Sequence, residues 1–326
     1  MIKIRKASYI IFIIIGIFFL FSSLQSNSMS FKRASEFNVT IYTQHNTQLL
    51  SDSISAIAAG APGEVGVALI VNNTDTIVVN NRSVYPMMSV FKLHQGLAIC
   101  DDFDRRGISL DSVVTIDRTE LDPDTWSPML KDHPDSSISL TVRDLLKYTL
   151  ISSDNNASNF MFKNLVSVDR TDKFIAKIIP RNSFKIAFSE EEMKADHDKA
   201  YENYTSPLGA ASLMNRLFAD SLLNSSKQSF IIKTLKQCST GKDRIAAPLL
   251  DRQGIVIAHK TGSGYRDANG VLAAHNDVAH IVTPEGISYT LAVFVKDFKG
   301  NEEEASKVIA KISATVYSLL TKKQNH

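Results

Sequence analysis

Apolar residues recur at helical spacing where the chain leaves its N-terminal segment. The positions, which share one face of a helix, are Leu49, Leu50, Ile54, Ile57 and Ala58. Residues 60–63, Gly-Ala-Pro-Gly, predict the end of this helix. Apolar stretches at 65–71 and 76–79 then predict two strands, and the polar residues 72–75 predict the hairpin turn between them.

The middle of the chain, from Pro86 to about Cys238, has mostly helical periodicity with long polar connections. One helix is predicted to begin at Ser89. Further amphipathic helices are predicted at residues 142–148, 157–165, 208–217 and 230–235.

Strand patterns return after Gly254, at residues 255–258, 277–282 and 289–295, and residues 302–320 predict a last amphipathic helix. Strands at both ends with helices between them favour an α/β two-lobed (α+β) fold. Its antiparallel sheet would come from both chain ends, with flanking helices and a separate all-helical lobe. The predicted sheet lobe covers about 47–85 and 245–326, and the helical lobe about 86–244. Ser89 would lie at the cleft between them.

The composition is that of an ordinary globular protein. The sequence has 326 residues, is 44% hydrophobic and carries a net charge of +2. This length allows a large core in one domain or in two closely packed ones. The near-neutral charge argues against a nucleic-acid partner, which normally requires a concentrated basic face.

The N-terminus has the pattern of an export signal. Lys3, Arg5 and Lys6 precede an apolar run over residues 9–21, and several serines follow. We expect a signal peptide of about residues 1–28, cleaved between Ser23 and Ser30, and a catalytic domain over 29–326. The mature protein would then lie in the periplasm without stable membrane association. The alternative is an uncleaved anchor, since the run is close to the length that spans a bilayer.

The cysteines and histidines predict no metal site. The two cysteines, Cys100 and Cys238, are interpreted as separate buried thiols, with a single disulfide as the alternative. The eight histidines are scattered, and none forms a cluster with zinc spacing.

Ser89 and Lys92 form a Ser-x-x-Lys sequence within Pro86–Lys92. If Ser89 opens a helix, residues three apart share a face and the hydroxyl and ammonium groups become neighbours. The unpaired N–H groups of a helix N-terminus could hold a developing oxyanion. A serine nucleophile needs both a proton acceptor and such a site, although the tetrapeptide alone is a weak signal.

Two further motifs follow in order. In the predicted loop Ser153-Asp154-Asn155, Ser153 could relay a proton, Asn155 could hold a substrate amide, and Asp154 is more typical of a loop-stabilising residue. The stretch 259–264, His-Lys-Thr-Gly-Ser-Gly, is predicted to end the strand 255–258. There Lys260 would bring a positive charge to the cleft, and Gly262 would let the strand approach a ligand closely.

Ser-x-x-Lys, Ser-Asp-Asn and Lys-Thr-Gly in this order are the signature of the penicillin-recognising serine enzymes. The chain resembles a class A serine β-lactamase over essentially its whole mature region. The segments YPMMSVFK, SDNNASN and AHKTGSG resemble the CfxA-like cephalosporinase branch in particular. The resemblance implies a monomeric hydrolase without a cofactor. Its substrates would be small β-lactam antibiotics, with cephalosporins preferred, and it would confer resistance to them.

The resemblance also implies roles for the motif residues. Ser89 would be the acylated nucleophile, Lys92 a possible base in acylation, and Ser153 the proton donor to the lactam nitrogen. Asn155 would bind the substrate side-chain amide. The substrate carboxylate would meet Lys260, Thr261 and Ser263, and the backbone N–H groups of Ser89 and Ser263 would form the oxyanion hole.

Trp126 and Arg244 are less certain members of the predicted site. Trp126 falls where the family places an aromatic residue at the cleft entrance, and a core tryptophan is the alternative. Arg244 is a candidate guanidinium for the substrate carboxylate, and a surface ion pair with Asp243 is the alternative.

A class A enzyme uses a loop glutamate to activate the water that frees the acyl-enzyme. The register set by Pro207 selects Glu190 within the loop 189–196, and Glu191 is the second choice. Two departures from the family pattern accompany it. Lys194 stands where the family has a water-binding asparagine, and Phe188 and Asn203 replace an Arg–Asp ion pair that closes the loop.

Two other functions share the three motifs. A penicillin-binding DD-peptidase would act on peptidoglycan stem peptides, and an antibiotic sensor would stay acylated. Glu190 favours the β-lactamase over the peptidase, whereas Lys194 keeps slow deacylation open.

Overall fold

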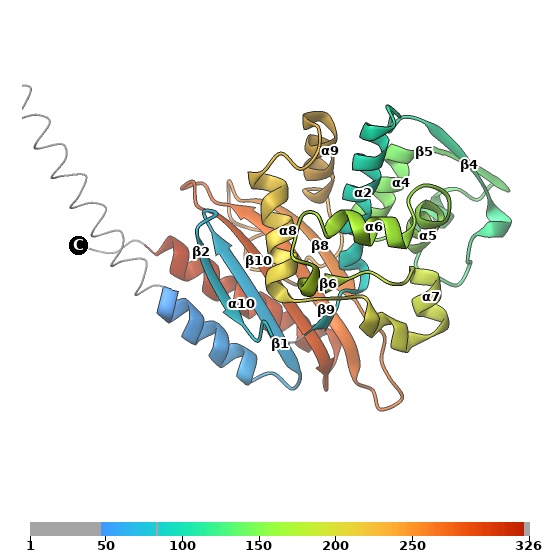
Figure 1. Ribbon diagram of the computed structural model, residues 1–326. Helices are drawn as coiled ribbons and strands as arrows, with labels where there is room; N and C mark the ends of the chain where they lie inside the picture. The colour runs from blue at the N-terminus through green and yellow to red at the C-terminus, as the bar shows by residue number, and fades with distance from the viewer. Residues whose placement is uncertain (1–46, 83, 323–326) are drawn as a thin grey trace, which may run out of the picture. The chain divides into compact units, whose positions relative to one another are not determined.

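The computed structural model describes residues 47–82 and 84–322 (Figure 1). Contacts divide the chain into residues 1–49 and residues 50–326, and the elements below belong to the second unit. The predicted signal peptide lies outside the described residues. Within residues 47–82 and 84–322, no helix combines the length and the apolar character needed to cross a bilayer.

A five-stranded antiparallel sheet joins the two ends of the described chain. Its spatial order is β2-β1-β10-β9-β8, so the hairpin of the two early strands joins the three late strands where β1 pairs with β10. The strands are β1 Glu64–Val71, β2 Asp75–Val79, β8 Val256–Ser263, β9 Leu272–Val282 and β10 Ser288–Phe298. This confirms the predicted fold class, including the hairpin turn at residues 72–75.

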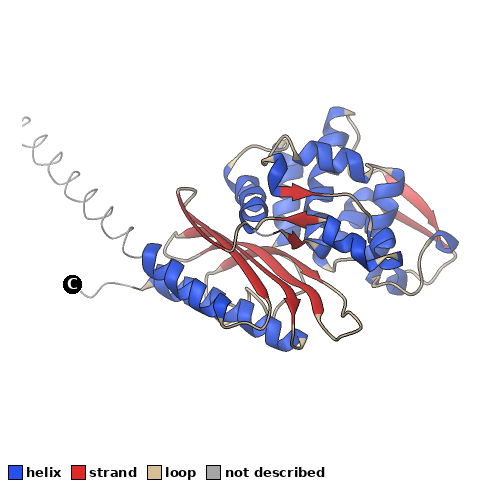
Figure 2. Cartoon of the chain, turned by 60° about the horizontal axis from the view of Figure 1, so that its bottom comes forward, coloured by secondary structure: helices blue, strands red, loops and turns tan. Residues whose placement is uncertain are grey.

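Helices cover both faces of this sheet (Figure 2). The helical residues 50–59 and α10 (Glu302–Thr321) bury Ile54, Ile309 and Ile312 against one face, together with Leu69 and Leu291 of the strands. On the other face α8 (Pro207–Ala219) contacts β1 and β10, and the helical block follows behind it. Strands β1, β9 and β10 thus have two buried faces, which explains their nearly continuous apolar pattern, whereas the edge strand β2 is partly exposed.

The helical block contains more elements than the periodicity predicts. Its helices are α2 Phe91–Arg105, α3 Pro128–Asp132, α4 Val142–Ile151, α5 Asn155–Asn164, α6 Val168–Ile175, α7 Glu190–Ala195 and α9 Ser225–Leu235. Short 3₁₀ turns occur at η1 Met88–Val90, η2 Arg118–Glu120, η3 Arg181–Ser183 and η4 His197–Glu202.

The prediction of an all-helical lobe was wrong in two places. A hairpin joins β4 (Val113–Asp117) to β5 (Ser137–Thr141), and a small sheet joins β3 (Tyr85–Pro86), β7 (Tyr204–Thr205) and β6 (Phe184–Lys185). The strands of the hairpin are half exposed, and those of the small sheet have two residues each, so neither leaves a long apolar pattern.

The strand predicted at 255–258 was too short, although the stretch 259–264 does end it as predicted. Strand β8 continues to Ser263 because residues 260–263 pair with residues 275–278 of β9. Side chains alternate along it. Ala258 belongs to the core beside the helical block, whereas Ile257 packs against the core beside α10. Lys260 and Gly262 therefore point toward the helical block, and His259 and Thr261 point toward α10.

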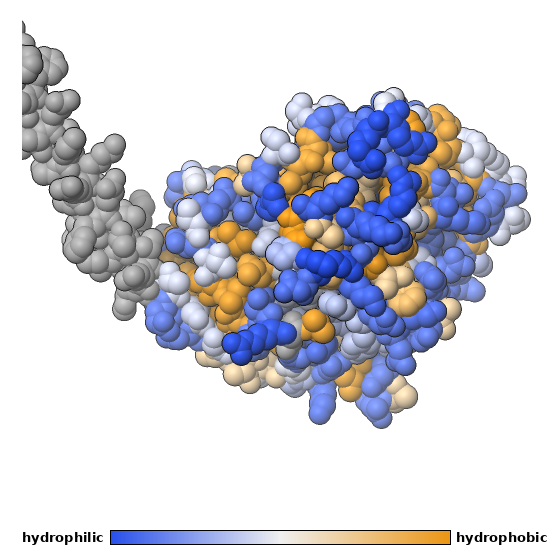
Figure 3. Space-filling model, viewed as in Figure 1, coloured by the Kyte–Doolittle hydropathy of each residue, from blue (hydrophilic) through white to orange (hydrophobic). Residues whose placement is uncertain are grey.

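Figure 3 shows hydrophilic side chains over most of one face, with smaller apolar areas between them. Large hydrophobic residues that stay exposed in the second unit include Val113, Trp126 and Leu250. Single exposed apolar residues of this kind are normal for a folded protein.

Candidate active site

Ser89 lies in the 3₁₀ turn η1, directly before α2, so it stands at the entrance of a helix as its sequence predicts. The preceding residue, Met88, has a φ of 46°, a conformation that non-glycine residues rarely adopt. Such backbone strain is typical of functional sites. Lys92 follows in the first turn of α2, and its Nζ lies 2.9 Å from the Ser89 Oγ.

The ammonium group of Lys92 is fully buried and contacts four oxygen atoms. Besides the Ser89 hydroxyl, these are Glu190 Oε1 at 2.8 Å, the Ser153 carbonyl at 2.8 Å and Asn155 Oδ1 at 2.6 Å. A buried cation requires such partners, because desolvation would otherwise favour its neutral form. Lys92 thereby joins side chains from three separate segments around one hydroxyl group.

Glu190 begins the short helix α7. Its neighbour Ser189 caps that helix, and Ser189 and Glu192 form a reciprocal capping box. The Ser89 hydroxyl donates a hydrogen bond to Glu190 Oε1 at 2.8 Å, and the side chain of Glu190 is only 10% exposed. Glu191 and Glu192 are exposed. Of the three adjacent glutamates, Glu190 is therefore the one that reaches the serine.

Ser153 and Lys260 form the opposite side of the cluster. Ser153 has a φ of 62°, and its hydroxyl accepts a hydrogen bond from Lys260 Nζ at 2.9 Å. Lys260 also donates to its neighbour's carbonyl, that of Thr261. Burial lowers the pKa of Lys260 to about 7, so its charge changes within the physiological pH range.

Asn155 and Asp154 have different tasks at the start of α5. The Asn155 side chain accepts from Lys92 and donates to Thr125 Oγ1 at 2.9 Å. The Asp154 carboxylate is buried, caps α5 and accepts from the Ser127 hydroxyl and the Met129 amide. Burial raises the pKa of Asp154. These contacts agree with the interpretation of Asp154 as a loop-stabilising residue.

Gly262 allows a close backbone approach between β8 and the turn that carries Ser89. A Cβ atom at this position would lie 2.4 Å from the Met87 carbonyl oxygen and 3.3 Å from the Ser89 amide nitrogen. The missing side chain lets β8 pack directly against the nucleophile turn. Asn276 on β9 supports the same contact, because its side chain donates to the Pro86 and Met87 carbonyls. No spacing in the sequence indicates this role of Asn276.

The hydroxyl groups of Thr261 and Ser263 have protein partners. The Thr261 hydroxyl lies 2.6 Å from that of Thr240, and the Ser263 hydroxyl accepts from Arg244 at 2.6 Å. Arg244 also donates to the Gly262 and Asn276 carbonyls. Burial lowers the pKa of Arg244. The alternative of a surface ion pair is wrong, because Arg244 is only 6% exposed.

Trp126 lies beside the loop that carries Ser153. Its indole N–H donates to the Ser152 carbonyl at 2.7 Å, and its backbone carbonyl accepts from the Asn155 amide. The residue is 55% exposed, so the core-tryptophan alternative is wrong. Lys131 lies over its ring, 5.3 Å from the centroid.

An asparagine closes the glutamate loop. The buried side chain of Asn203 accepts hydrogen bonds from the Ala187 and Phe188 amides and donates to the Phe188 carbonyl. Neutral hydrogen bonds thus join the two segments that the family pattern joins with an ion pair. The other departure, Lys194, forms a 2.5 Å ion pair with Asp122 and lowers the pKa of that carboxyl group.

Both cysteines are free thiols, with Cys100 buried and Cys238 partly exposed. Across the described ranges 47–82 and 84–322, no group of three or more His, Cys, Asp or Glu side chains is arranged to hold a metal ion.

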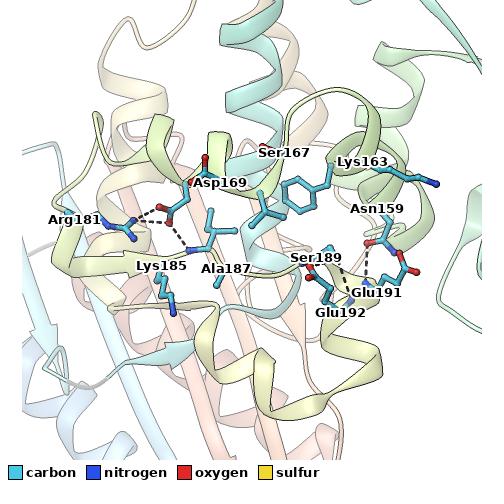
Figure 4. A pocket seen from close by; sticks show the side chains of 14 residues that line it. Asn159, Lys163, Ser167, Asp169, Arg181, Lys185, Ala187, Ser189, Glu191 and Glu192 are labelled. Carbon is cyan, nitrogen blue, oxygen red and sulfur yellow. Dashed lines mark hydrogen bonds and ion pairs between the residues drawn. The ribbon is translucent and has the colours of Figure 1, made fainter.

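A separate pocket of about 580 Å³ lies outside this cluster (Figure 4). Its lining comes from α5, α6 and the chain between η3 and α7, and includes Asn159, Asp169, Arg181 and Glu191. Arg181 is paired with Asp172 at 2.8 Å. Ser189, Glu191 and Glu192 of the glutamate loop line this pocket, whereas Ser89, Lys92, Ser153, Glu190 and Lys260 do not.

The sheet built from both chain ends, with a serine between two lysines and a glutamate, defines a penicillin-recognising serine enzyme. The profile of the "Beta-lactamase enzyme family" matches residues 49–320. A β-lactamase of Phocaeicola vulgatus is 70% identical over 274 residues, which cover 84% of this chain and 85% of that protein.

Solved structures show the same likeness. The TLA-3 extended-spectrum β-lactamase has a TM-score of 0.81 and 30% identity, covering 85% of this chain and 100% of the other. A class A β-lactamase from Bacteroides cellulosilyticus has a TM-score of 0.80 and 30% identity, with 85% and 99% covered. The chain therefore belongs to the β-lactamase enzyme family, as a class A serine β-lactamase that hydrolyses the amide bond of β-lactam antibiotics.

Proposed function

We propose that hydrolysis proceeds through an acyl-enzyme on Ser89. The Ser89 oxygen attacks the lactam carbonyl while its proton passes to the Glu190 carboxylate, or to Lys92 if that side chain is a neutral amine in this step. The backbone N–H groups of Ser89 and Ser263 hold the oxyanion. When the C–N bond breaks, Ser153 gives its proton to the nitrogen, and the proton taken from Ser89 passes on to the Ser153 oxygen, which the cation of Lys260 stabilises in the meantime. This transfer restores both the base and Ser153 before deacylation. The direct Ser89–Glu190 hydrogen bond is the observation that carries this proposal.

Deacylation in this proposal depends on Glu190. Once Ser89 is acylated, its hydroxyl proton is gone, and Glu190 Oε1 is free to accept a proton from a water molecule instead. That water attacks the ester carbonyl, the ester C–O bond breaks, and Ser89 recovers a proton. Lys92 stays beside both oxygens throughout.

Substrate binding is assigned to the cleft edge. Lys260, Thr261 and Ser263 would meet the substrate carboxylate, with Arg244 supporting Ser263 from behind the strand. The side chain of Asn155 would bind the substrate amide. The exposed ring of Trp126 would pack on the substrate side chain at the rim.

We further propose a preference for cephalosporins. Asn203 closes the glutamate loop with neutral hydrogen bonds to the Ala187 and Phe188 amides, in place of the Arg–Asp ion pair of the family. We infer that this closure leaves more space beside the loop for the bulky side chains of cephalosporins. The relative TLA-3 is described as an extended-spectrum enzyme.

The double variant Phe188→Arg, Asn203→Asp tests this preference. It should turn over oxyimino-cephalosporins about tenfold less well relative to small penicillins, since modest pocket changes discriminate by such factors. If the variant and its parent had the same ratio of oxyimino-cephalosporin turnover to penicillin turnover, the proposal would be contradicted.

Export to the periplasm, a monomeric state and the two-lobe division at about residues 86 and 245 complete the proposal. The basic and apolar pattern of residues 3–21 supports export.

A nitrocefin assay on the purified protein tests the mechanism. Sustained turnover is expected. A single stoichiometric burst followed by a stable acyl-enzyme would instead favour the peptidase or the sensor, which share the three motifs.

A further inference from the structure

A second cluster of reactive groups lies on the α10 side of β8, where the proposed mechanism uses no proton transfer. Cys238 follows α9, His259 lies on β8 and Asp277 lies on β9. The Cys238 thiol lies beside His259 and 3.4 Å from Thr240 Oγ1, and His259 Nδ1 lies 3.1 Å from Asp277 Oδ1. His259 and Asp277 are buried, whereas Cys238 is partly exposed.

The order thiol, imidazole, carboxylate is the arrangement that activates a nucleophile. The imidazole takes the thiol proton, and the carboxylate holds the imidazole in position and stabilises its positive charge. Asp277 is itself fixed, because its other oxygen accepts from the Ile245 amide at 3.1 Å. The cluster therefore has a nucleophile, a base and an orienting group, contributed by three separate segments.

The charged groups that face the Cys238 thiol also favour its thiolate form. Burial alone would raise the pKa of Cys238, but the hydrogen bond and charge of His259, together with Lys260, lower it to about 7. Burial alone would lower the pKa of His259, but Asp277 and Cys238 raise it to about 10. Arg244 is the other charged side chain that interacts with the thiol.

We propose that Cys238 is an activated thiol that forms mixed disulfides with small disulfide compounds. The Cys238 thiolate attacks one sulfur atom of the small disulfide, a new S–S bond forms, and the other half leaves as a thiolate that can take the proton from His259. The exchange needs no further oxidant. An export compartment is an oxidising environment in which such disulfides persist.

The thiol also has a direct connection to the serine site. Its sulfur lies 3.4 Å from Thr240 Oγ1, which in turn lies 2.6 Å from Thr261 Oγ1. A thiolate at Cys238 also raises the pKa of Lys260. An adduct on Cys238 would remove that charge and crowd Thr240. It should raise the KM for nitrocefin, an effect that rests on the proposed function.

Alkylation with iodoacetamide tests the thiol without reference to hydrolysis. At pH 6 Cys238 should react about tenfold faster than an ordinary thiol, since its larger thiolate fraction outweighs its lower nucleophilicity. Its rate should level off above about pH 7. Cys100 is an internal control, because it is buried and burial raises its pKa to about 12. Peptide mass mapping assigns the label to one cysteine.

Variants separate the activated thiol from a merely accessible one. His259→Gln should slow labelling about tenfold at pH 6 and move the inflection upward. His280→Gln, at a buried histidine bound to Thr290, is the matched control and should leave the rate unchanged. Cys238→Ser should abolish fast labelling and the mixed disulfide with dithionitrobenzoate.

An unlabelled Cys238 in the folded protein, or a wild-type inflection near pH 9, would overturn the proposal even if His259→Gln failed to fold. Failure of nitrocefin turnover would affect only the proposed function, because the labelling is read independently.

Discussion

The two faces of β8 support different chemistry, although their residues alternate along one strand. Lys260 points toward the helical block and binds Ser153, beside the serine cluster. His259, one residue earlier, points toward α10 and binds Asp277 and Cys238. The serine cluster gathers two ammonium groups around hydroxyl groups, whereas the thiol cluster pairs one imidazole with one thiol.

This difference shows how period-two alternation lets a single strand serve two buried polar clusters. Neither cluster crosses the sheet, but they are coupled at short range. The Cys238 charge acts on Lys260, and Thr240 connects the sulfur to Thr261. We therefore expect large effects within one cluster and small effects from one cluster to the other.

The largest expected effect is loss of the serine nucleophile. Ser89→Ala should reduce nitrocefin turnover by about four orders of magnitude, because removing a nucleophile disables the whole catalytic unit. Ser139→Ala, at an exposed position of β5, is the control and should retain full activity. Substantial residual turnover by Ser89→Ala would show that another group is acylated.

The pH dependence of Lys260 should be the next largest effect. Burial holds its pKa at about 7, below the ordinary value, so the cation is present at lower pH and is lost as the pH rises. The KM of a carboxylate-bearing cephalosporin should rise about tenfold between pH 7 and pH 9, because a charge-assisted hydrogen bond disappears.

The guanidinium of a Lys260→Arg variant stays charged over this range, so that variant should lose the pH dependence. Steady-state kinetics across pH 6–9 measure how KM depends on pH in the parent and in the Lys260→Arg variant. A flat profile for the parent would refute a carboxylate-binding role for the titrating lysine.

A smaller effect is expected from the loop. Asn203→Ala removes a buried side chain that makes hydrogen bonds to the Ala187 and Phe188 backbone, and should cost about 1–3 kcal/mol in unfolding free energy. Thermal denaturation measures the loss. Asn164→Ala, whose exposed amide bonds only within α5, should change little. Equal stability losses in both variants would contradict the loop-closing role of Asn203.

The smallest expected effect is that of a substitution in the thiol cluster on catalysis at the serine cluster, across β8. His259→Gln should change the KM for nitrocefin by about twofold, in line with coupling of about 0.5 kcal/mol between neighbouring networks. A loss as large as that of Ser89→Ala would place His259 in the serine cluster itself.

The sheet could be predicted from the sequence because strands covered on both faces leave long apolar stretches, as in residues 65–71 and 289–295. The predicted strand 255–258 was shorter than β8 because the second half of β8 is polar. His259, Lys260 and Thr261 are buried by pairing with β9 and by tertiary partners, which no local pattern records. The half-exposed hairpin of β4 and β5 was missed for the opposite reason.

Motifs predicted the residues around Ser89 because Ser-x-x-Lys, Ser-Asp-Asn and Lys-Thr-Gly each keep their parts close in sequence. Asn276 and Thr240 have no such neighbours, and their roles depend on how β9 and the segment after α9 meet β8. The thiol cluster was missed for the same reason, since its three residues come from separate segments.

Intact-mass spectrometry of a Glu190→Gln variant tests the central claim most directly. After mixing with a cephalosporin, the variant should gain the mass of one opened substrate molecule on Ser89 and keep it for at least minutes. The matched Glu191→Gln variant should turn over normally. A Glu190→Gln variant that hydrolyses the drug at the parental rate, with no retained adduct, would contradict the account.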